Sequence, residues 1–401
     1  MGFVSPAWPP AANSNGIVTY VAGIRAGLSA QGIESSVFAN RMDANEADDD
    51  LIDVTHFKPP ALLDAAHRAH EFLTRKSAMA WRLGRRIGAA VRETHRSTPL
   101  CLLEMEETFG AAWYVRRMCP VPLVVRLHGP WLAVGPAMGV ARDSRSLERE
   151  RLEGLAILAA DAVSSPSRYS LERVREHYGI ELPDAVVIPN PVARLAPEHQ
   201  WRIERCDRRS ILFVGRFDRL KGGDLVIDAF RIVARERPEA ELLFVGPDRG
   251  LLNETGSVQS LPEYVHARLT PDVAARVRML GHQSPALIRN LRQRSLVAVV
   301  ASRFENFPMT VLEALGCGSP LVAASVGGIP EIVTGESNGL LFAGGDSGEL
   351  ARQLLRIFGD PGLARSIGET GVRDAEVRFA PAVVARQTSA FYGRVMGRRH
   401  D

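Results

Sequence analysis

Long apolar runs are missing from this sequence. No stretch reaches the roughly 18 consecutive apolar residues that a membrane-spanning helix needs. The first ten residues lack the basic segment followed by an apolar one that marks a signal peptide. The 49 Lys and Arg residues are nearly balanced by 46 Asp and Glu residues, and the net charge of +3 gives no whole-molecule indication of nucleic-acid binding. These absences favour a cytoplasmic protein without a nucleic-acid partner.

Cysteine is scarce and shows no pattern. The four cysteines lie far apart, without the C-x-x-C or Cys/His spacing of a metal or redox site. Cys101 and Cys317 fall in apolar segments, so we expect them to be buried, reduced thiols. Reduced thiols agree with a cytoplasmic location.

The dinucleotide fingerprint G-x-G-x-x-G is absent as well. The chain nevertheless opens with a strand at Phe3, a glycine turn, apolar residues at helical spacing from 17 to 30, and a second strand at 36–39. This is a βαβ unit in which the backbone at Gly16 could approach a phosphate. The missing glycines and the missing acidic ribose partner argue against a dinucleotide oxidoreductase.

Strands and helices alternate along the whole chain. At 401 residues the sequence is too long for one typical hydrophobic core, and the alternation falls into two halves. We therefore expect an α/β protein with two Rossmann-like domains facing across a cleft.

One stretch, Ser302 to Gly318, carries the most chemistry. It reads as a loop that leaves an apolar strand at 296–300 and enters a helix, with Pro308 placed in the first helical turn. A helix start after a strand offers free amides and the positive end of a dipole to a phosphate. Glu305 and Glu313 do not suit a phosphate, but their carboxylates can accept hydrogen bonds from sugar hydroxyls. A bland alternative is that Glu305 caps the helix and Glu313 faces solvent.

The E-x7-E spacing of these two glutamates, followed by Gly327-Gly328-Ile329-Pro330-Glu331 and Asn338-Gly339-Leu340-Leu341, resembles the retaining glycosyltransferases of family 4. The resemblance implies the GT-B fold and a nucleotide-sugar donor. It implies that Glu313 holds the ribose and Glu305 the sugar ring. Donor contacts are also implied for the backbone of the residues between them: Phe307, Pro308, Met309, Thr310 and Val311.

Two further motifs resemble the same family. Gly215-Arg216 and Lys221-Gly222 follow an apolar strand, and in the family the Arg and Lys of this motif grip the donor diphosphate. Two cations flanking a glycine turn fit that role better than solvent-facing charges do. His128, at the end of the strand that begins at Leu123, matches a family histidine close to the transferred sugar. The resemblance thus makes His128, Glu305, Arg216 and Lys221 the catalytic candidates, and Gly16 a donor contact.

The acceptor side is less defined. A strand at 100–103 ends in three glutamates, and the carboxyl ends of strands are where open α/β sheets bind ligands. The resemblance assigns no role to these glutamates, and we take all three as acceptor-side candidates: Glu104, Glu106 and Glu107. The resemblance gives an acceptor-binding domain over 1–195, to which the C-terminal helix in 380–401 returns, and a donor-binding domain over 196–379.

Two charged segments have alternative interpretations. Asp48-Asp49-Asp50 contains the D-x-D letters with which glycosyltransferases of the other major fold hold a metal, but its polar surroundings favour a solvated loop. Residues 61–96 read as a long helical segment, and 58–96 has nine basic residues against three acidic ones. It is either an amphipathic helix with a solvated basic face, which we favour, or a peripheral membrane contact. The excursion at 248–272 either shapes the donor side or merely covers the surface.

The resemblance to family 4 implies a retaining, metal-independent glycosyltransferase without a cofactor. It would move a sugar from a nucleotide sugar, with UDP-sugar favoured, to an acceptor hydroxyl in polysaccharide, glycoconjugate or secondary-metabolite biosynthesis. A nucleotide-sugar epimerase of similar fold and a non-catalytic nucleotide-sugar-binding protein are the alternatives. A phosphorylase would need a lysine for pyridoxal phosphate, and no such site is evident.

Overall fold

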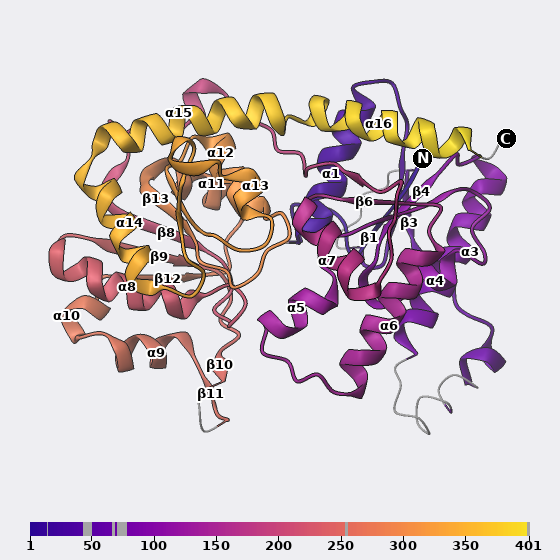
Figure 1. Cartoon of the computed structure of the whole chain (residues 1–401), viewed down its shortest axis with the longest axis horizontal. Coiled ribbons are helices and arrows are strands. Elements are labelled where there is room, and N and C mark those ends of the chain that lie inside the picture. The colour runs from indigo at the N-terminus through magenta and orange to yellow at the C-terminus, as the bar shows by residue number, and fades with distance from the viewer. Residues whose placement is uncertain (14, 43–49, 66–68, 70–77, 253–255, 399–401) are drawn as a thin grey trace. The chain divides into compact units, whose positions relative to one another are not determined.

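The computed structural model describes residues 1–398 except 14, 43–49, 66–68, 70–77 and 253–255. The chain forms two compact units. The first comprises Met1–Pro136, Val140–Pro191 and Pro381–Asp401, and the second comprises Ala137–Gly139 and Val192–Ala380. Figure 1 shows the elements of both.

The first unit is built on a seven-stranded parallel sheet with the order β3-β2-β1-β4-β5-β6-β7. Its strands are β1 (Gly2–Ser5), β2 (Ser36–Ala39), β3 (Leu51–Asp53), β4 (Leu103–Glu106), β5 (Leu123–Arg126), β6 (Ala162–Ser165) and β7 (Val186–Val187). Its helices are α1 (Gly16–Ser29), α3 (Met79–Ser97), α4 (Ala112–Val115), α5 (Trp131–Ala137), α6 (Ser144–Ala159), α7 (Arg168–Tyr178) and α16 (Pro381–Gly397), with short 3-10 turns at Val54–His56 and Thr108–Gly110.

The second unit has a six-stranded parallel sheet with the order β12-β9-β8-β13-β14-β15. Its strands are β8 (Asp207–Val214), β9 (Glu241–Val245), β12 (Val277–Gly281), β13 (Ser295–Val300), β14 (Leu321–Ala324) and β15 (Leu340–Phe342). Its helices are α8 (Gly223–Glu236), α9 (Leu261–Arg268), α10 (Pro271–Ala274), α11 (Pro285–Arg294), α12 (Met309–Cys317), α13 (Ile329–Ile332), α14 (Ser347–Gly359) and α15 (Pro361–Arg378), with 3-10 turns at Pro197–His199 and Gly335–Ser337.

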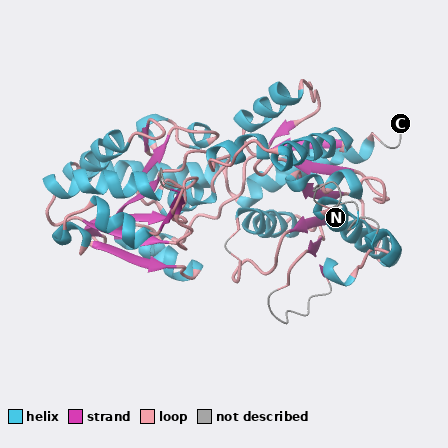
Figure 2. Cartoon of the chain, turned by 90° about the horizontal axis from the view of Figure 1, so that it is seen from below, coloured by secondary structure: helices cyan, strands magenta, loops and turns pink. Residues whose placement is uncertain are grey.

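Both sheets are covered by helices, which explains why their strands read as nearly continuous apolar runs. Figure 2 shows helices beside the strands of each unit. In the first unit, Phe3 and Val37 pack toward α1 and α16, whereas Val4 and Phe38 belong to the core on the opposite face of the sheet. A Cβ on Gly27 of α1 would lie 2.5 Å from the carbonyl oxygen of Pro381, so this close approach of α1 and α16 requires glycine.

Each sheet has a point at which the winding of the chain reverses. In the first unit it lies between β1 and β4, and in the second between β8 and β13. In open α/β sheets, ligands commonly bind outside the carboxyl ends of the strands at such a reversal. The predicted α/β fold with two Rossmann-like sheets is confirmed.

Several predicted boundaries move. Cys101 is exposed rather than buried, because the strand begins only at Leu103 and Cys101 lies in the bend before it. The prediction of one continuous helix over 61–96 is wrong, because Ala78 lies outside α3, which begins only at Met79. Much of the rest of that segment, and Asp48 and Asp49 of the acidic loop, lie outside the described residues. The excursion at 248–272 holds a two-stranded antiparallel hairpin, β10 (Leu251–Leu252) with β11 (Val258–Gln259), and α9.

Candidate functional site

The loop between β8 and α8 is organised by Asp218. One carboxylate oxygen of Asp218 accepts from Nε of Arg216 at 2.6 Å, and the other accepts from the backbone N–H of Lys221 at 2.8 Å. Gly222 then adopts φ +70°, and a Cβ there would lie 1.9 Å from the carbonyl oxygen of Ala301. The glycine is required because this loop passes against the end of β13. The two predicted cations are thus held on one turn.

The neighbouring loop, after β13, carries Glu305. Its Oε1 accepts from Nζ of Lys221 at 2.6 Å and from the hydroxyl of Ser302 at 2.7 Å. Gly327, at φ +56°, packs so tightly that a Cβ would lie 1.8 Å from the Glu305 carbonyl oxygen. The N–H of Gly328 donates to that same oxygen at 3.0 Å. The Gly327-Gly328 pair therefore serves to hold the Glu305 backbone in place.

The helix start at α12 differs in detail from the prediction. Pro308 is the residue before the helix, with ψ 129°, rather than a member of its first turn. Its carbonyl oxygen accepts from the N–H groups of Val311 and Leu312, at 3.2 and 3.3 Å. Helix geometry leaves the N–H groups of Met309 and Thr310 without an intrahelical acceptor. These two amides are the ones available to an anion.

Two residues of this stretch contribute side chains to the core instead. Phe307 is buried, with its ring centroid 5.8 Å from that of Phe379, and Val311 is fully buried. Because their side chains pack inward, any contact they make with a donor is through the main chain.

Glu313 lies on α12, where an arginine from α11 meets it. The guanidinium of Arg292 is 2.5 Å from Oε2 of Glu313, and the side chains are 7% and 35% exposed, respectively. A buried arginine thus orients a half-exposed carboxylate, whose hydrogen-bonding capacity this single contact does not exhaust.

In the first unit, His128 follows β5 and is fixed through both backbone and ring. The carboxylate of Glu107 accepts from the N–H groups of His128 and Gly129, each at 2.8 Å. The Tyr20 ring lies edge-on to the His128 ring, with centroids 5.0 Å apart. Burial, helped by the nearby Arg126 guanidinium, lowers the pKa of His128 well below its usual range. The imidazole is therefore neutral at neutral pH.

The three glutamates at the end of β4 have different partners. Glu104 lies inside β4, not after it, and its oxygens accept from the hydroxyls of Tyr20 and Tyr392, each at 2.8 Å. Both carboxylate oxygens of Glu107 accept hydrogen bonds from the backbone N–H groups of His128 and Gly129. Glu106 is 8% exposed, and its Oε2 has no hydrogen-bond partner among the residues that the structure describes. Of the three, Glu106 retains capacity for a ligand.

Burial raises the pKa of all three carboxyls. The pKa of Glu106 rises to about 7 and that of Glu107 to about 8, with the nearby Glu153 adding to the effect on Glu107. For Glu104 burial also raises the pKa, against the lowering influence of Arg126 and the two tyrosines. Hydrogen bonds, and for Glu104 also the charge of Arg126, offset the desolvation of these carboxyls only in part.

Gly16 is the first residue of α1. A Cβ at this position would meet no atom within 4 Å, so the backbone is approachable there. Asn15 caps the helix, because its side-chain oxygen accepts from the N–H of Ile17 at 2.8 Å. Asn15 therefore has a structural function as the cap of this helix.

Two family models match this chain over almost its whole length. Residues 14–194 match the model described as Glycosyltransferase Family 4, and residues 198–374 match the one described as Glycosyl transferases group 1. The chain belongs to the family 4 glycosyltransferases.

Curated relatives of this glycosyltransferase include proteins named D-inositol 3-phosphate glycosyltransferase. The one from Streptomyces bingchenggensis is 28% identical over 296 residues, which cover 71% of this chain and 64% of that protein's own length. The one from Corynebacterium diphtheriae is 27% identical over 298 residues, covering 70% of this chain and 67% of that protein.

Solved structures show the same fold. Sucrose-phosphate synthase from Thermosynechococcus elongatus superposes with a TM-score of 0.73 at 21% identity, over 99% of this chain and 98% of that one. HepE of Anabaena in complex with UDP-glucose gives a TM-score of 0.67 at 18% identity, over 98% of this chain and all of that one. These similarities confirm the GT-B fold of this glycosyltransferase.

Sequence reasoning missed the residues that hold the candidate site together. Asp218, Ser302 and Arg303 make polar contacts to or beside Lys221 and Glu305. Their signal was present, since two of them stand within three positions of Glu305 and the third lies between Arg216 and Lys221. Arg292 had no comparable signal, because it lies in another element, 21 positions before Glu313.

The described residues lack both a cluster of metal ligands and a membrane-spanning helix. In that part of the chain, no group of three or more His, Cys, Asp or Glu side chains could hold a metal ion, and no helix has both the length and the apolar character to cross a membrane.

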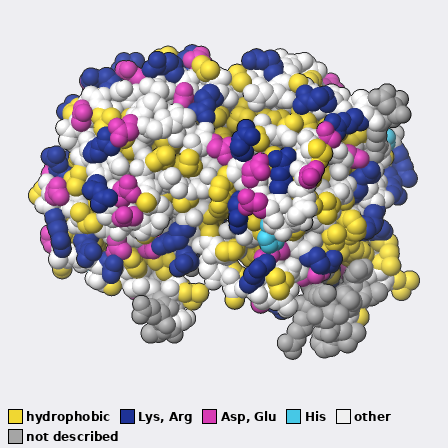
Figure 3. Space-filling model, viewed as in Figure 1, with side chains coloured by type: hydrophobic (Ala, Val, Ile, Leu, Met, Phe, Trp, Pro, Cys, Tyr) yellow, Lys and Arg dark blue, Asp and Glu magenta, His cyan; other side chains and the backbone are white. Residues whose placement is uncertain are grey.

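Helix α3 buries Trp81, Ile87 and Val91. On the face shown in Figure 3, basic side chains are interspersed with acidic ones.

Proposed function

We propose that this glycosyltransferase moves a sugar from a nucleotide-sugar donor, with UDP-sugar favoured, to a hydroxyl of an acceptor, with retention of the anomeric configuration and without a metal ion. The proposal rests mainly on the contact between Lys221 and Glu305. This contact places a cation suited to a diphosphate next to a carboxylate suited to sugar hydroxyls, at the carboxyl ends of the two strands where the winding of the sheet reverses.

The diphosphate is assigned to the cations and the helix start. Cleavage of the bond between the sugar and the diphosphate builds negative charge on the leaving phosphate. Arg216, Lys221 and the amides of Met309 and Thr310 would stabilise this charge, because preorganised donors lower the energy of the state in which the charge develops. The same groups can supply this charge stabilisation without a divalent metal.

The hydroxyl groups are assigned to the glutamates. Glu313, held by Arg292, would accept from the ribose, and Glu305 would accept from the sugar ring. His128, neutral at neutral pH, is assigned a hydrogen bond to the transferred sugar, as the family resemblance implies. Glu106 is the glutamate best suited to an acceptor hydroxyl, since Glu104 and Glu107 already accept hydrogen bonds from protein groups.

Retention would follow from displacement on one face of the sugar. The bond between the anomeric carbon and the diphosphate oxygen breaks, the bond to the acceptor oxygen forms on the same face, and the departing phosphate takes the acceptor proton. Glu305 is not assigned the nucleophilic role that a carboxylate has in retaining glycoside hydrolases. Its Oε1 is shared by Lys221 and Ser302, which favours a binding role.

The decisive experiment measures nucleotide release from UDP-, GDP- and ADP-sugars, with and without an acceptor panel and with and without a chelator. The proposal predicts release that depends on an acceptor, persists in chelator and yields a product of unchanged anomeric configuration. Turnover of the nucleotide sugar without any acceptor would instead identify an epimerase. Binding without turnover across the panel would identify a non-catalytic binding protein.

We propose that one domain binds the acceptor and the other binds the donor, as in the family. Residues 1–195, with the helix in 380–401, would bind the acceptor, which for the relatives called D-inositol 3-phosphate glycosyltransferase is D-inositol 3-phosphate by name. Residues 196–379 would bind the donor. Peripheral membrane contact through 58–96 stays the less favoured alternative to an ordinary amphipathic helix, and a vesicle-binding measurement distinguishes the two.

A further inference from the structure

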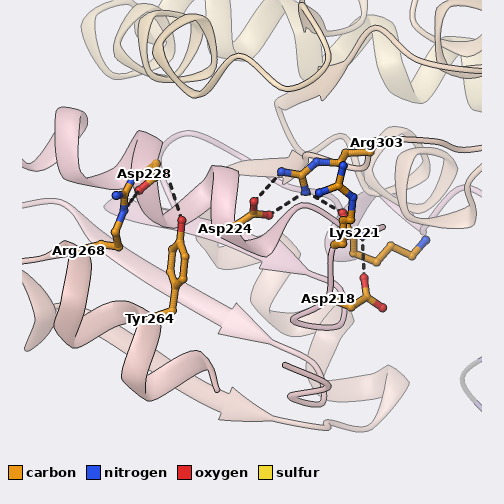
Figure 4. A network of polar contacts seen from close by, with 8 residues as sticks. Asp218, Lys221, Asp224, Asp228, Tyr264, Arg268 and Arg303 are labelled. Carbon is orange, nitrogen blue, oxygen red and sulfur yellow. Dashed lines mark hydrogen bonds and ion pairs between the residues drawn. The ribbon is translucent and has the colours of Figure 1, made fainter. Parts of the chain in front are cut away.

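Arg303 connects the two loops of the candidate donor site. It stands two positions before Glu305, in the loop after β13, yet its side chain reaches the loop after β8 (Figure 4). Its Nη1 donates to the carbonyl oxygen of Arg219 at 2.7 Å, and its backbone N–H donates to the carbonyl oxygen of Leu220 at 2.8 Å. Both acceptors lie in the two residues that immediately precede Lys221.

The same guanidinium also holds the first turn of α8. Nη1 and Nη2 contact the two carboxylate oxygens of Asp224, at 2.9 and 2.5 Å. The side chains of Arg303 and Asp224 are only 22% and 18% exposed, so the pair is largely shielded from water. Arginine suits this position because its planar fork can bond a carboxylate with two N–H groups and still reach a carbonyl oxygen.

These contacts enclose Lys221 on both sides along the chain. Arg303 holds Arg219 and Leu220 before it and Asp224 after it, whereas the Lys221 side chain extends to Glu305. We propose that Arg303 is a positioning residue, which sets the placement of Lys221 relative to Glu305 so that the cation is in register for the donor diphosphate before the donor binds. This inference rests on the proposed function.

The chain contains a matched control for a purely structural role. Asp228 lies one turn after Asp224 on α8, and Arg268 of α9 bonds both of its oxygens, at 2.8 and 2.9 Å (Figure 4). Tyr264 adds a third contact at 3.2 Å. Within the described residues, the contacts of the Arg268 guanidinium are with Asp228 and with the Tyr264 ring, not with the loop that carries Lys221. Both arginines tether α8, but only Arg303 holds the residues beside Lys221.

The test compares Arg303→Gln and Arg303→Lys with Arg268→Gln in the full chain. UDP, GDP and ADP are the probes, and calorimetry measures their affinities. The diphosphate that binds most tightly is then compared with the monophosphate of the same nucleoside. Arg303→Gln is expected to weaken diphosphate binding about tenfold. The reason is that a misplaced Lys221 would lose a charge-assisted contact with the diphosphate, and such a contact contributes roughly a factor of ten to affinity. Monophosphate binding should change less than about twofold, and Arg303→Lys should restore little because it lacks the fork. Arg268→Gln should leave both affinities within about twofold of the original.

A double-substitution cycle separates positioning from a direct contact. If Arg303 acts through Lys221, then adding Arg303→Gln to Lys221→Ala should weaken diphosphate binding by less than about a further twofold. Full additivity of the two losses, or equal effects of Arg303→Gln and Arg268→Gln, would overturn the inference. Lys221→Ala by itself reports on the proposed function. If it weakens diphosphate binding but Arg303→Gln does not, only the inference on Arg303 fails. If neither does, or none of the three diphosphates binds, the proposed function fails too.

Discussion

The guanidinium of Arg292 and the carboxylate of Glu313 form a 2.5 Å contact between α11 and α12. The arginine is nearly buried and the glutamate is half-exposed, so the interior partner orients the one that can meet a ligand. Removing a buried partner of a charged pair leaves the other charge without its main orienting contact. The second glutamate of the E-x7-E motif thus depends on a residue outside the motif.

Arg292→Met is expected to raise the donor KM about tenfold with a smaller change in kcat, because Glu313 is assigned to ground-state binding of the ribose. Steady-state nucleotide release measures both constants. Arg289→Met, which removes an exposed cation from the same helix, is the control and should leave the donor KM nearly unchanged. An unchanged KM for the Arg292 variant would show that Glu313 does not need this partner.

Glu305→Gln should lower kcat at least about a hundredfold while the protein stays folded, because the variant loses the charge that pairs with Lys221 and a strong acceptor for sugar hydroxyls. Any residual product should keep the anomeric configuration, and mass spectrometry of the protein should show no sugar adduct. Glu331→Gln, in the nearby α13, provides a comparison of equal chemistry. A covalent adduct or an inverted product would reassign Glu305 to the chemistry itself.

Tyr392→Phe should reduce the free energy of unfolding by about 1–3 kcal/mol, because it deprives the buried Glu104 carboxylate of one of its two tyrosine hydroxyls. Urea denaturation measures the loss. Thr388→Val removes another buried hydroxyl from α16, but one that donates within its own helix, to the carbonyl oxygen of Val384. Equal losses in the two variants would mean that the contact with Glu104 has no special weight.

Glu106→Gln should make stability less dependent on pH. Burial raises the pKa of Glu106 to about 7 from its usual value, so the folded state holds a proton that the unfolded state has released. The wild-type protein should therefore lose stability as the pH rises from about 4.5 through 7, by up to about 3 kcal/mol from this group. The variant should lack that part of the loss and be the more stable protein at pH 8.

Urea denaturation at pH 5 and at pH 8 gives the comparison for Glu106. Glu93→Gln, at an exposed position of α3, should follow the wild-type pH dependence. If Glu106→Gln keeps the wild-type slope between the two pH values, Glu106 is ionised in the folded protein throughout that range. The same variant, assayed for transfer, tests the proposed acceptor contact through the acceptor KM.

Local sequence patterns predicted helices and strands well where the spacing of apolar residues and the positions of the turn residues agree. The strand before Ser302 and the glycine after Cys317 bound the predicted loop and helix, and Gly318 does end α12 in the left-handed conformation. The errors lie where a local signal is ambiguous by a few residues. Glu104 looked like the residue after a strand because charged residues are rare inside sheets, yet two tyrosines satisfy it there. Cys101 looked buried because its neighbours are apolar, but it lies before the strand starts.

The sequence by itself determined the fold class, the family and the types of side chain at the candidate site, because periodicity, turn residues and motif spacing are all local along the chain. Only the tertiary structure decided which of these side chains meet. Lys221 and Glu305 are 84 positions apart, as are Arg219 and Arg303, and Tyr392 reaches Glu104 from 288 positions away. Such contacts depend on strand order and on the register between neighbouring strands, which bring β8 beside β13 and return α16 to the first sheet. No short-range pattern contains that information.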